Sequence, residues 1–135
     1  DEKEKNLRMI LNFGHTFAHG FEGATNFSKK LNHGEAVLLG MITASHLANK
    51  IKLLPKNDLL LIKKHYDELK LPMKISKFFK KNKINKIVSF MQKDKKNLNS
   101  KINLILIKKI GKATNPIIIS FSKSKIKNFL NNLYK

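Results

Sequence analysis

Apolar residues at helical intervals, interrupted by glycine and proline, constrain the fold of this 135-residue chain more than any other feature. Apolar residues recur at helical intervals through 2–22, 34–53 and 56–69, which predicts three helices. The chain between these segments is rich in residues that end helices. The predicted ends are marked by Gly20, Gly23, Pro55 and Pro72.

The second and third predicted helices differ in the faces that they offer for packing. Ala36, Gly40 and Ala44 recur along the second helix, and such small residues allow another backbone to approach closely. The third helix carries larger apolar side chains, which are expected to point inward. They are Leu59, Leu60, Ile62, Tyr66 and Leu69.

The rest of the chain predicts shorter elements. One or two short helices are expected within 74–93, and the clearest covers 85–93. The runs 102–108 and 115–121 are typical of strands and would pair as a hairpin, followed by a helix capped by Ser124. The expected fold is mainly α, with five or six helices and one small β-hairpin. Because a lone hairpin is marginal in water, it should pack on a helix or belong to a larger protein.

The net charge of +19 raises the question of a nucleic-acid partner. Residues 1–50 carry six basic and five acidic side chains, whereas 51–135 carry 22 and four. All but one of the basic residues are lysine, and Arg8 is the exception. Specific readers of bases and phosphates draw heavily on arginine. The composition therefore predicts salt-sensitive, non-specific binding and no specific nucleic-acid partner.

Composition also limits the cellular setting. The chain has no cysteine, so disulfides and thiolate metal sites are excluded. No apolar run approaches the ~20 residues needed to span a bilayer. The charged start, DEKEKNLR, does not resemble a signal peptide. A single cytoplasmic domain is the expectation.

The first predicted helix places six polar residues of mixed chemistry on one face, within an arc of about 80°. Two of these residues, His15 and His19, stand at i and i+4 and can bind one metal ion together. Alternatively, His33 at the start of the second helix could share an ion with His15. A zincin protease is not favoured, because Thr16 stands where its glutamate would be. The six residues are Glu4, Arg8, Asn12, His15, His19 and Glu22. His46 and His65 have no nearby ligand partners in the sequence and are expected to be ordinary surface or core histidines.

Several motifs in order along the chain resemble those of 3-dehydroquinate synthases. The chain begins with DEKE and contains LNFGHTFAHGFE at 11–22. HGEAV follows at 33–37, and GM at 40–41. Met91 then precedes DKK at 94–96, and Ile-Gly stands at 110–111. The combined match is far more specific than any one of these short motifs.

This resemblance implies an enzyme of the shikimate route to aromatic amino acids. It would convert 3-deoxy-D-arabino-heptulosonate 7-phosphate to 3-dehydroquinate and phosphate, using NAD⁺ and a divalent metal, Zn²⁺ or Co²⁺. Residues 1–135 would form the C-terminal domain of an α/β plus α two-domain enzyme. The chain contains no Gly-rich dinucleotide fingerprint, so NAD⁺ would sit mainly on an N-terminal domain absent from this chain. The full enzyme is expected to be a homodimer, and the isolated domain inactive.

The resemblance also implies roles for individual residues. His15 and His33 would be metal ligands, completed by a glutamate from the upstream domain. His19 and Glu4 would act in proton transfer. On a straight continuous helix Glu4 and His19 would lie about 22 Å apart, so Glu4 must fold back or act indirectly. The substrate phosphate and carboxylate need cationic and amide donors, which would be supplied by Arg8, Asn12 and one or both of Lys95 and Lys96.

Two alternatives remain open at this point. A different sugar-phosphate cyclase of the same superfamily would use the same motifs to form another ring product. A non-enzymatic basic module would instead use 51–135 to bind nucleic acid, and steep salt dependence would reveal it.

Overall fold

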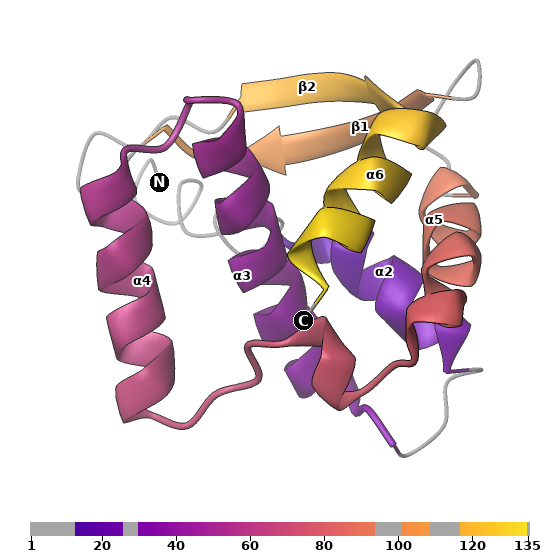
Figure 1. Ribbon diagram of the computed structural model, residues 1–135, viewed down its shortest axis with the longest axis horizontal. Helices are drawn as coiled ribbons and strands as arrows, with labels where there is room; N and C mark the ends of the chain where they lie inside the picture. The colour runs from indigo at the N-terminus through magenta and orange to yellow at the C-terminus, as the bar shows by residue number, and fades with distance from the viewer. Residues whose placement is uncertain (1–12, 26–29, 94–100, 109–116, 135) are drawn as a thin grey trace, which may run out of the picture.

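The computed structural model describes residues 13–25, 30–93, 101–108 and 117–134. Within these residues the fold is mainly helical, with one two-stranded antiparallel sheet, as predicted (Figure 1). The elements are α2 (His15–Ala24), α3 (His33–Lys50), α4 (Lys56–Glu68), the 3-10 helices η1 (Ile75–Lys77) and η2 (Lys81–Lys83), α5 (Ile84–Gln92), β1 (Lys101–Leu106), β2 (Ile117–Ser122) and α6 (Lys123–Leu133).

The prediction of one helix through 2–22 is wrong at Phe13 and Gly14. These two residues form a turn, and α2 begins at His15 with Gly14 as its N-cap. Residues 2–12 lie outside the described part of the chain. Glycine is a weak helix former, so the contact that Gly14 makes with α3 can take precedence over helical geometry at this position.

The crossing of α2 and α3 depends on two glycines. A Cβ atom added to Gly14 would lie 2.4 Å from the backbone nitrogen of Met41, and one added to Gly40 would lie 2.3 Å from the carbonyl oxygen of Gly14. No side chain fits at such distances, because the neighbouring atoms belong to the backbone. The predicted close approach along the second helix is therefore confirmed, and the two backbones meet at Gly14 and Gly40.

Both glycines of α2 were predicted to mark the end of the helix, which is wrong for Gly20, whereas Gly23 lies one residue before the last helical residue, Ala24. Gly20 and Gly23 lie inside α2 and are buried. A Cβ atom on Gly20 would lie 2.8 Å from the carbonyl oxygen of Ile87, and one on Gly23 would lie 2.3 Å from the Phe90 ring. Their small size thus allows α5 to approach α2 on the side away from α3.

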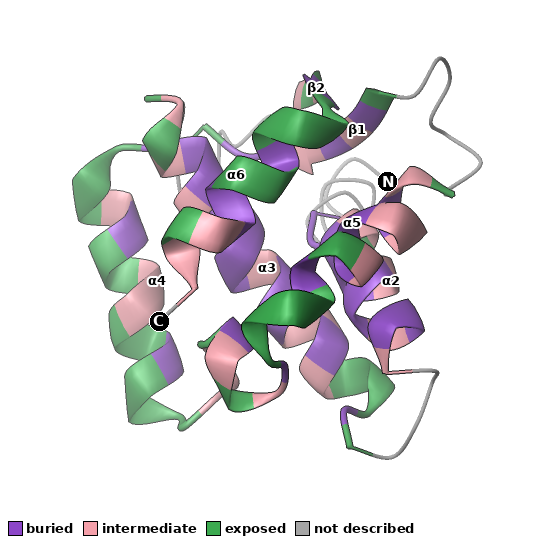
Figure 2. Ribbon diagram, turned by 45° about the vertical axis from the view of Figure 1, so that its right-hand side comes forward, coloured by how far each residue is buried: buried purple, intermediate pink, exposed green. Residues whose placement is uncertain are grey.

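The hydrophobic core lies around α2, which packs against both α3 and α5. Phe17 stacks on Phe21, with ring centroids 6.3 Å apart, and also meets Phe129 of α6 at 6.3 Å. Phe21 meets Phe79 at 5.7 Å. Figure 2 shows the buried residues concentrated on the inner faces of the helices and the exposed ones along α4 and α6. The largest fully buried side chains include Phe17, Phe21, Leu39, Ile42, Leu47, Ile87, Met91, Leu104 and Leu106.

Helix α4 buries a narrower stripe than predicted. Leu59 is buried, and the Tyr66 hydroxyl donates a hydrogen bond of 2.6 Å to the carbonyl oxygen of Leu38 on α3. Leu60 and Leu69, predicted to point inward, are 49% and 67% exposed. The reason is that α4 lies at the edge of the molecule and packs mainly on α3 (Figure 1).

The predicted hairpin is confirmed and packs on helices. β1 pairs antiparallel with β2, with Ile102 opposite Phe121 and Leu104 opposite Ile119. The sheet lies across one end of the helices, and β1 contacts α3 and α5 (Figure 1). The cap of the last helix was predicted two residues too late, since Ser122 rather than Ser124 accepts the hydrogen bond from the Lys125 backbone nitrogen.

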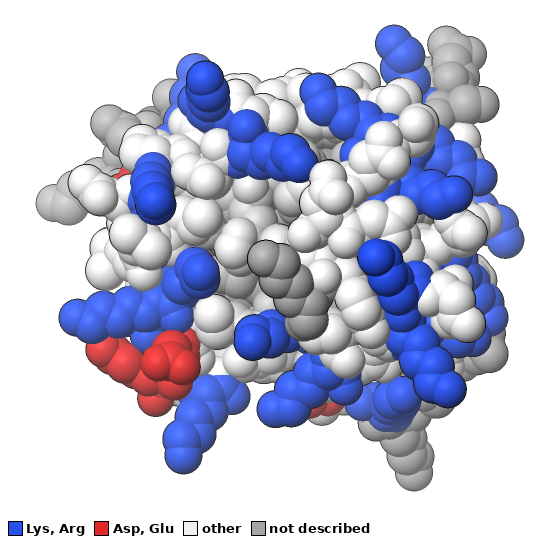
Figure 3. Space-filling model, viewed as in Figure 1, with Lys and Arg blue, Asp and Glu red and all other residues white. Residues whose placement is uncertain are grey.

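On the face shown in Figure 3, the basic side chains are spread rather than gathered into one patch. Figure 3 shows lysine side chains over the whole face viewed, with a small acidic group near one edge. In the described part of the chain, no helix has the length and apolar character to cross a membrane.

Candidate metal and substrate site

One face of α2 carries two histidines and a glutamate, which are side chains that can bind a metal ion or transfer a proton. His15 is exposed, and His19 and Glu22 are half-buried. At about 100° per residue these three positions fall within an arc of roughly 60°. The opposite side of the helix carries Phe17 and Phe21, which are buried in the core. Burial of the phenylalanines therefore directs the histidines and the glutamate outward together.

The start of α3 is built to hold His33 in place. Asn32 is the N-cap, and its side chain accepts a hydrogen bond of 2.8 Å from the Glu35 backbone nitrogen. The Glu35 carboxylate accepts one of 3.0 Å from the Asn32 backbone nitrogen, which completes a capping box. His33 is the first residue of α3, so its backbone is fixed between these two hydrogen bonds.

The side chains of the two helices meet where His33 contacts Glu22. The His33 Nδ1 atom lies 3.2 Å from both carboxylate oxygens of Glu22. The His33 side chain is 70% exposed and that of Glu22 is 20% exposed. Along α2, Glu22 is about 10 Å from His15 and about 4.5 Å from His19, at 1.5 Å per residue. His33 thus approaches α2 at the turn after His19.

The donor types at this site fit a divalent metal such as zinc, which binds imidazole nitrogen. Because His33 uses Nδ1 toward Glu22, its Nε2 atom is the one available for an ion. No group of three or more His, Cys, Asp or Glu side chains within the described ranges could hold a metal by itself. An open catalytic zinc site normally uses three protein ligands, so a complete set needs at least one group from elsewhere.

The remaining predicted site residues lie outside the described part of the chain. They are Glu4, Arg8, Asn12, Lys95 and Lys96. The break at Gly14 also removes the premise of one continuous helix from Glu4 to His19, on which the separation of about 22 Å was based. Only His15, His19 and Glu22 are observed on a common helix face.

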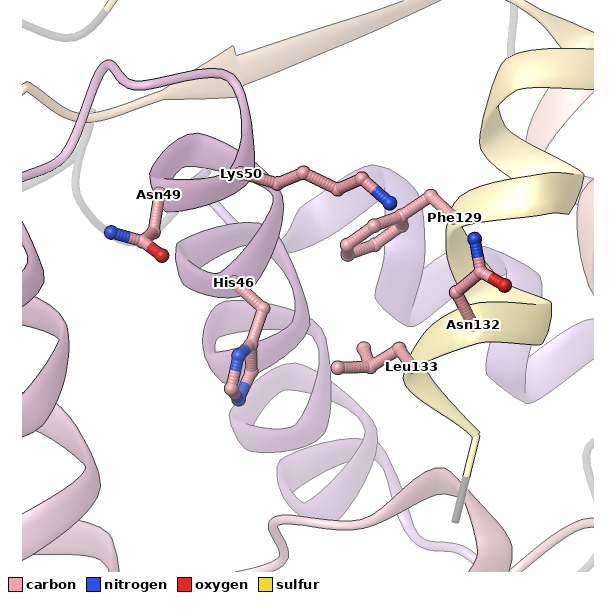
Figure 4. Close-up of a pocket in the computed structure, with 6 residues that line it drawn as sticks. All are labelled: His46, Asn49, Lys50, Phe129, Asn132 and Leu133. Atoms are coloured by element: carbon pink, nitrogen blue, oxygen red, sulfur yellow. The ribbon is translucent and has the colours of Figure 1, made fainter.

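His46 lies in a groove that the sequence did not indicate (Figure 4). The groove has a volume of about 310 Å³ and runs between α3 and α6. Burial lowers the pKa of His46, and the Lys63 ammonium nearby lowers it further. The described lining contains no carboxylate and no second histidine, as expected for an ordinary histidine. The lining residues are His46, Asn49, Lys50, Phe129, Asn132 and Leu133. His65 is exposed on α4.

The sequence did not indicate that Glu22 contacts His33. Glu22 was placed on the histidine face but given no function. The available signal was its spacing, three residues after His19 and seven after His15, together with its carboxylate chemistry. Its partner could not be identified, because His33 lies 11 residues away on another helix.

Comparisons with known proteins relate the chain to one family. The family described as 3-dehydroquinate synthase C-terminal matches residues 1–97. The chain is 50% identical to the 3-dehydroquinate synthase of Pelagibacter ubique, over 96% of this chain and 35% of that protein. It is 41% identical to the 3-dehydroquinate synthase of Endomicrobium trichonymphae, over 87% of this chain and 31% of that protein. The chain therefore spans about a third of the length of these relatives.

The fold resembles that of a solved sugar-phosphate cyclase. A crystal structure of 2-deoxy-scyllo-inosose synthase, complexed with carbaglucose-6-phosphate, NAD⁺ and Co²⁺, superposes with a TM-score of 0.64. The match covers 90% of this chain and 32% of that one, at 24% identity, so it supports the fold alone. Since the family match extends over residues 1–97 of 135, the chain belongs to the 3-dehydroquinate synthase C-terminal family.

Proposed function

We propose that this chain is the metal- and substrate-binding domain of a 3-dehydroquinate synthase. The full-length protein would convert 3-deoxy-D-arabino-heptulosonate 7-phosphate to 3-dehydroquinate and phosphate, a step toward aromatic amino acids. The observation that carries this proposal is the 50% identity to a 3-dehydroquinate synthase over 96% of the chain. The imidazoles and carboxylate assembled by α2 and α3 support it independently.

The proposal includes a second domain in the full-length protein that binds NAD⁺. The relatives are about three times as long as this chain, which leaves room for such a domain. It would also supply the third metal ligand that the described residues lack. The enzyme is proposed to be cytoplasmic and to form a homodimer. Sedimentation of the full-length protein would test the dimer.

His15 and His33 would hold the metal ion, Zn²⁺ or Co²⁺, through imidazole nitrogen. When bound, a divalent ion polarises substrate hydroxyl groups, and NAD⁺ accepts and returns a hydride. His19 lies one helical turn from His15, on the same face, and would transfer a proton to or from the substrate. Glu4 would assist that transfer. The anionic groups of the substrate would be held by Arg8, Asn12 and one or both of Lys95 and Lys96.

The decisive experiment is an assay of the full-length protein with NAD⁺ and Zn²⁺. Release of phosphate and formation of 3-dehydroquinate from the heptulosonate phosphate would support the proposal. Turnover of glucose 6-phosphate instead would favour the other candidate, a cyclase resembling 2-deoxy-scyllo-inosose synthase, with which the chain shares its fold. Absence of both activities, combined with nucleic-acid binding that weakens steeply with salt, would favour the basic module.

A further inference from the structure

The contact between Glu22 and His33 restricts the protonation of the histidine ring. An ionised carboxylate can only accept hydrogen bonds, so the proton between Glu22 and His33 must belong to Nδ1. In the neutral ring the lone pair then lies on Nε2. Because the His33 side chain is 70% exposed, this nitrogen is accessible from outside the helix pair.

Both partners are held by rigid parts of the fold. His33 follows the capping box of Asn32 and Glu35. Glu22 stands on α2, next to Gly23, which packs directly against the Phe90 ring of α5. The crossing at Gly14 and Gly40 sets the spacing of the two helices. The carboxylate is therefore presented to the ring by two packed helices rather than by a mobile loop.

We propose that Glu22 is a positioning residue for the metal site. Its carboxylate holds the His33 ring in one orientation and in the Nδ1–H tautomer, which leaves Nε2 as the nitrogen that would bind the metal ion. This inference rests on the proposed function, in which His33 is a metal ligand. In this proposal Glu22 acts through His33 and would bind neither the ion nor the substrate.

The competing explanation is that Glu22 and His33 form an ordinary surface ion pair, which contributes little to the stability of the fold. The chain offers a matched control for it. Glu68 on α4 lies 3.9 Å from Lys64, and both side chains are exposed. Replacing Glu68 removes a carboxylate from an ion pair that lies outside the histidine site.

The test compares full-length proteins carrying Glu22→Ala, Glu22→Gln, Glu68→Ala or His33→Ala. Zinc affinity is measured by competition with a chelator. Glu22→Ala should bind zinc about 10- to 100-fold more weakly, with stoichiometric zinc still bound at saturation. Glu22→Gln keeps a carbonyl acceptor for the Nδ1 proton and should lose less. Glu68→Ala should bind zinc within about twofold of the wild type.

A second measurement reports the tautomer directly. In metal-free protein with ¹⁵N-labelled histidine, NMR should find His33 in the Nδ1–H form, and Glu22→Ala should shift it toward Nε2–H. Unchanged zinc affinity and tautomer in Glu22→Ala would overturn the inference, provided that His33→Ala loses zinc. Complete loss of zinc from Glu22→Ala and Glu22→Gln would also overturn it, because Glu22 would then be a ligand. Retention of zinc by His33→Ala would instead refute the proposed metal site.

Discussion

At the residue scale, the three histidines of the candidate site have similar chemistry and different proposed roles. His15 and His19 share one face of α2, and His33 meets that helix at Glu22. The sequence predicts two alternative pairings for metal binding. Either His15 and His33 hold the ion, as proposed, or His15 and His19 chelate it together.

Alanine variants of the full-length protein separate these pairings. His15→Ala and His33→Ala should each lose bound zinc, because each removes one of the proposed ligands. His19→Ala should keep stoichiometric zinc and bind substrate while losing most of kcat, as expected for a proton-transfer group. Elemental analysis and steady-state kinetics provide the two readouts. Zinc lost from the His19 variant but kept in the His33 variant would reverse the assignment.

Arg8 is the only arginine in a chain that otherwise uses lysine. If it contacts a substrate anion in bidentate fashion, lysine cannot replace it, because an ammonium lacks the planar fork. Arg8→Lys in the full-length enzyme should lower kcat/KM by well over tenfold and leave the melting temperature nearly unchanged. Near-normal turnover would instead indicate a surface role, such as an ion pair with Glu4, worth only a few tenths of a kcal/mol.

His46 predicts a specific pH dependence of stability. Burial and Lys63 lower its pKa in the folded state below the ordinary value of 6.5. The unfolded state therefore binds this proton more readily, and stability should fall as the pH drops from about 6.5 toward the lowered value. His46→Gln should reduce the fall in melting temperature between about pH 7.5 and 5.5. The control variant is His65→Gln, which removes an exposed imidazole from α4.

At the scale of elements, the crossing of α2 and α3 is the feature that brings the candidate site together. It depends on the absence of side chains at Gly14 and Gly40, where each backbone lies in the space that a Cβ atom would fill. Backbone atoms cannot turn aside as the end of a flexible side chain can. A larger residue at either position must therefore push the helices apart.

Gly40→Ala should accordingly destabilise the protein by about 1–3 kcal/mol or more, the usual range for overpacking. It should also weaken zinc binding, because His15 and His33 lie on the two helices that separate. Gly34→Ala on the same helix is the matched control. A Cβ atom there meets only the Asn32 side-chain oxygen at 3.5 Å, an ordinary contact. Chemical denaturation measures both variants, and equal stabilities would contradict the proposed role of the crossing.

At the scale of the whole molecule, the site is incomplete within the described residues. They contain no cluster of three or more potential metal ligands, and the relatives are about three times as long as this chain. A purified fragment of residues 1–135, supplied with NAD⁺ and Zn²⁺, should therefore not turn over the heptulosonate phosphate. The full-length protein in the same assay is the positive control. Turnover by the fragment would show that the proposed second domain is dispensable.

The sequence by itself determined the helical class, the hairpin and the family. Helical spacing of apolar residues and alternation in a strand are local patterns, so they predicted α3, α4 and the β1–β2 pair within a few residues. The histidine motifs at 15, 19 and 33 were also visible, because resemblance to a family requires only residue identity and order.

Only the tertiary structure decided which of these residues meet. The start of α2 at His15 follows from packing of Gly14 against α3, and the exposure of Leu60 and Leu69 follows from the position of α4 at the edge. The contact of Glu22 with His33 joins two helices whose relative position depends on glycines at 14 and 40. A local pattern fixes which side of a helix is apolar. The depth and angle at which helices pack depend on residues distant in sequence, which no local pattern contains.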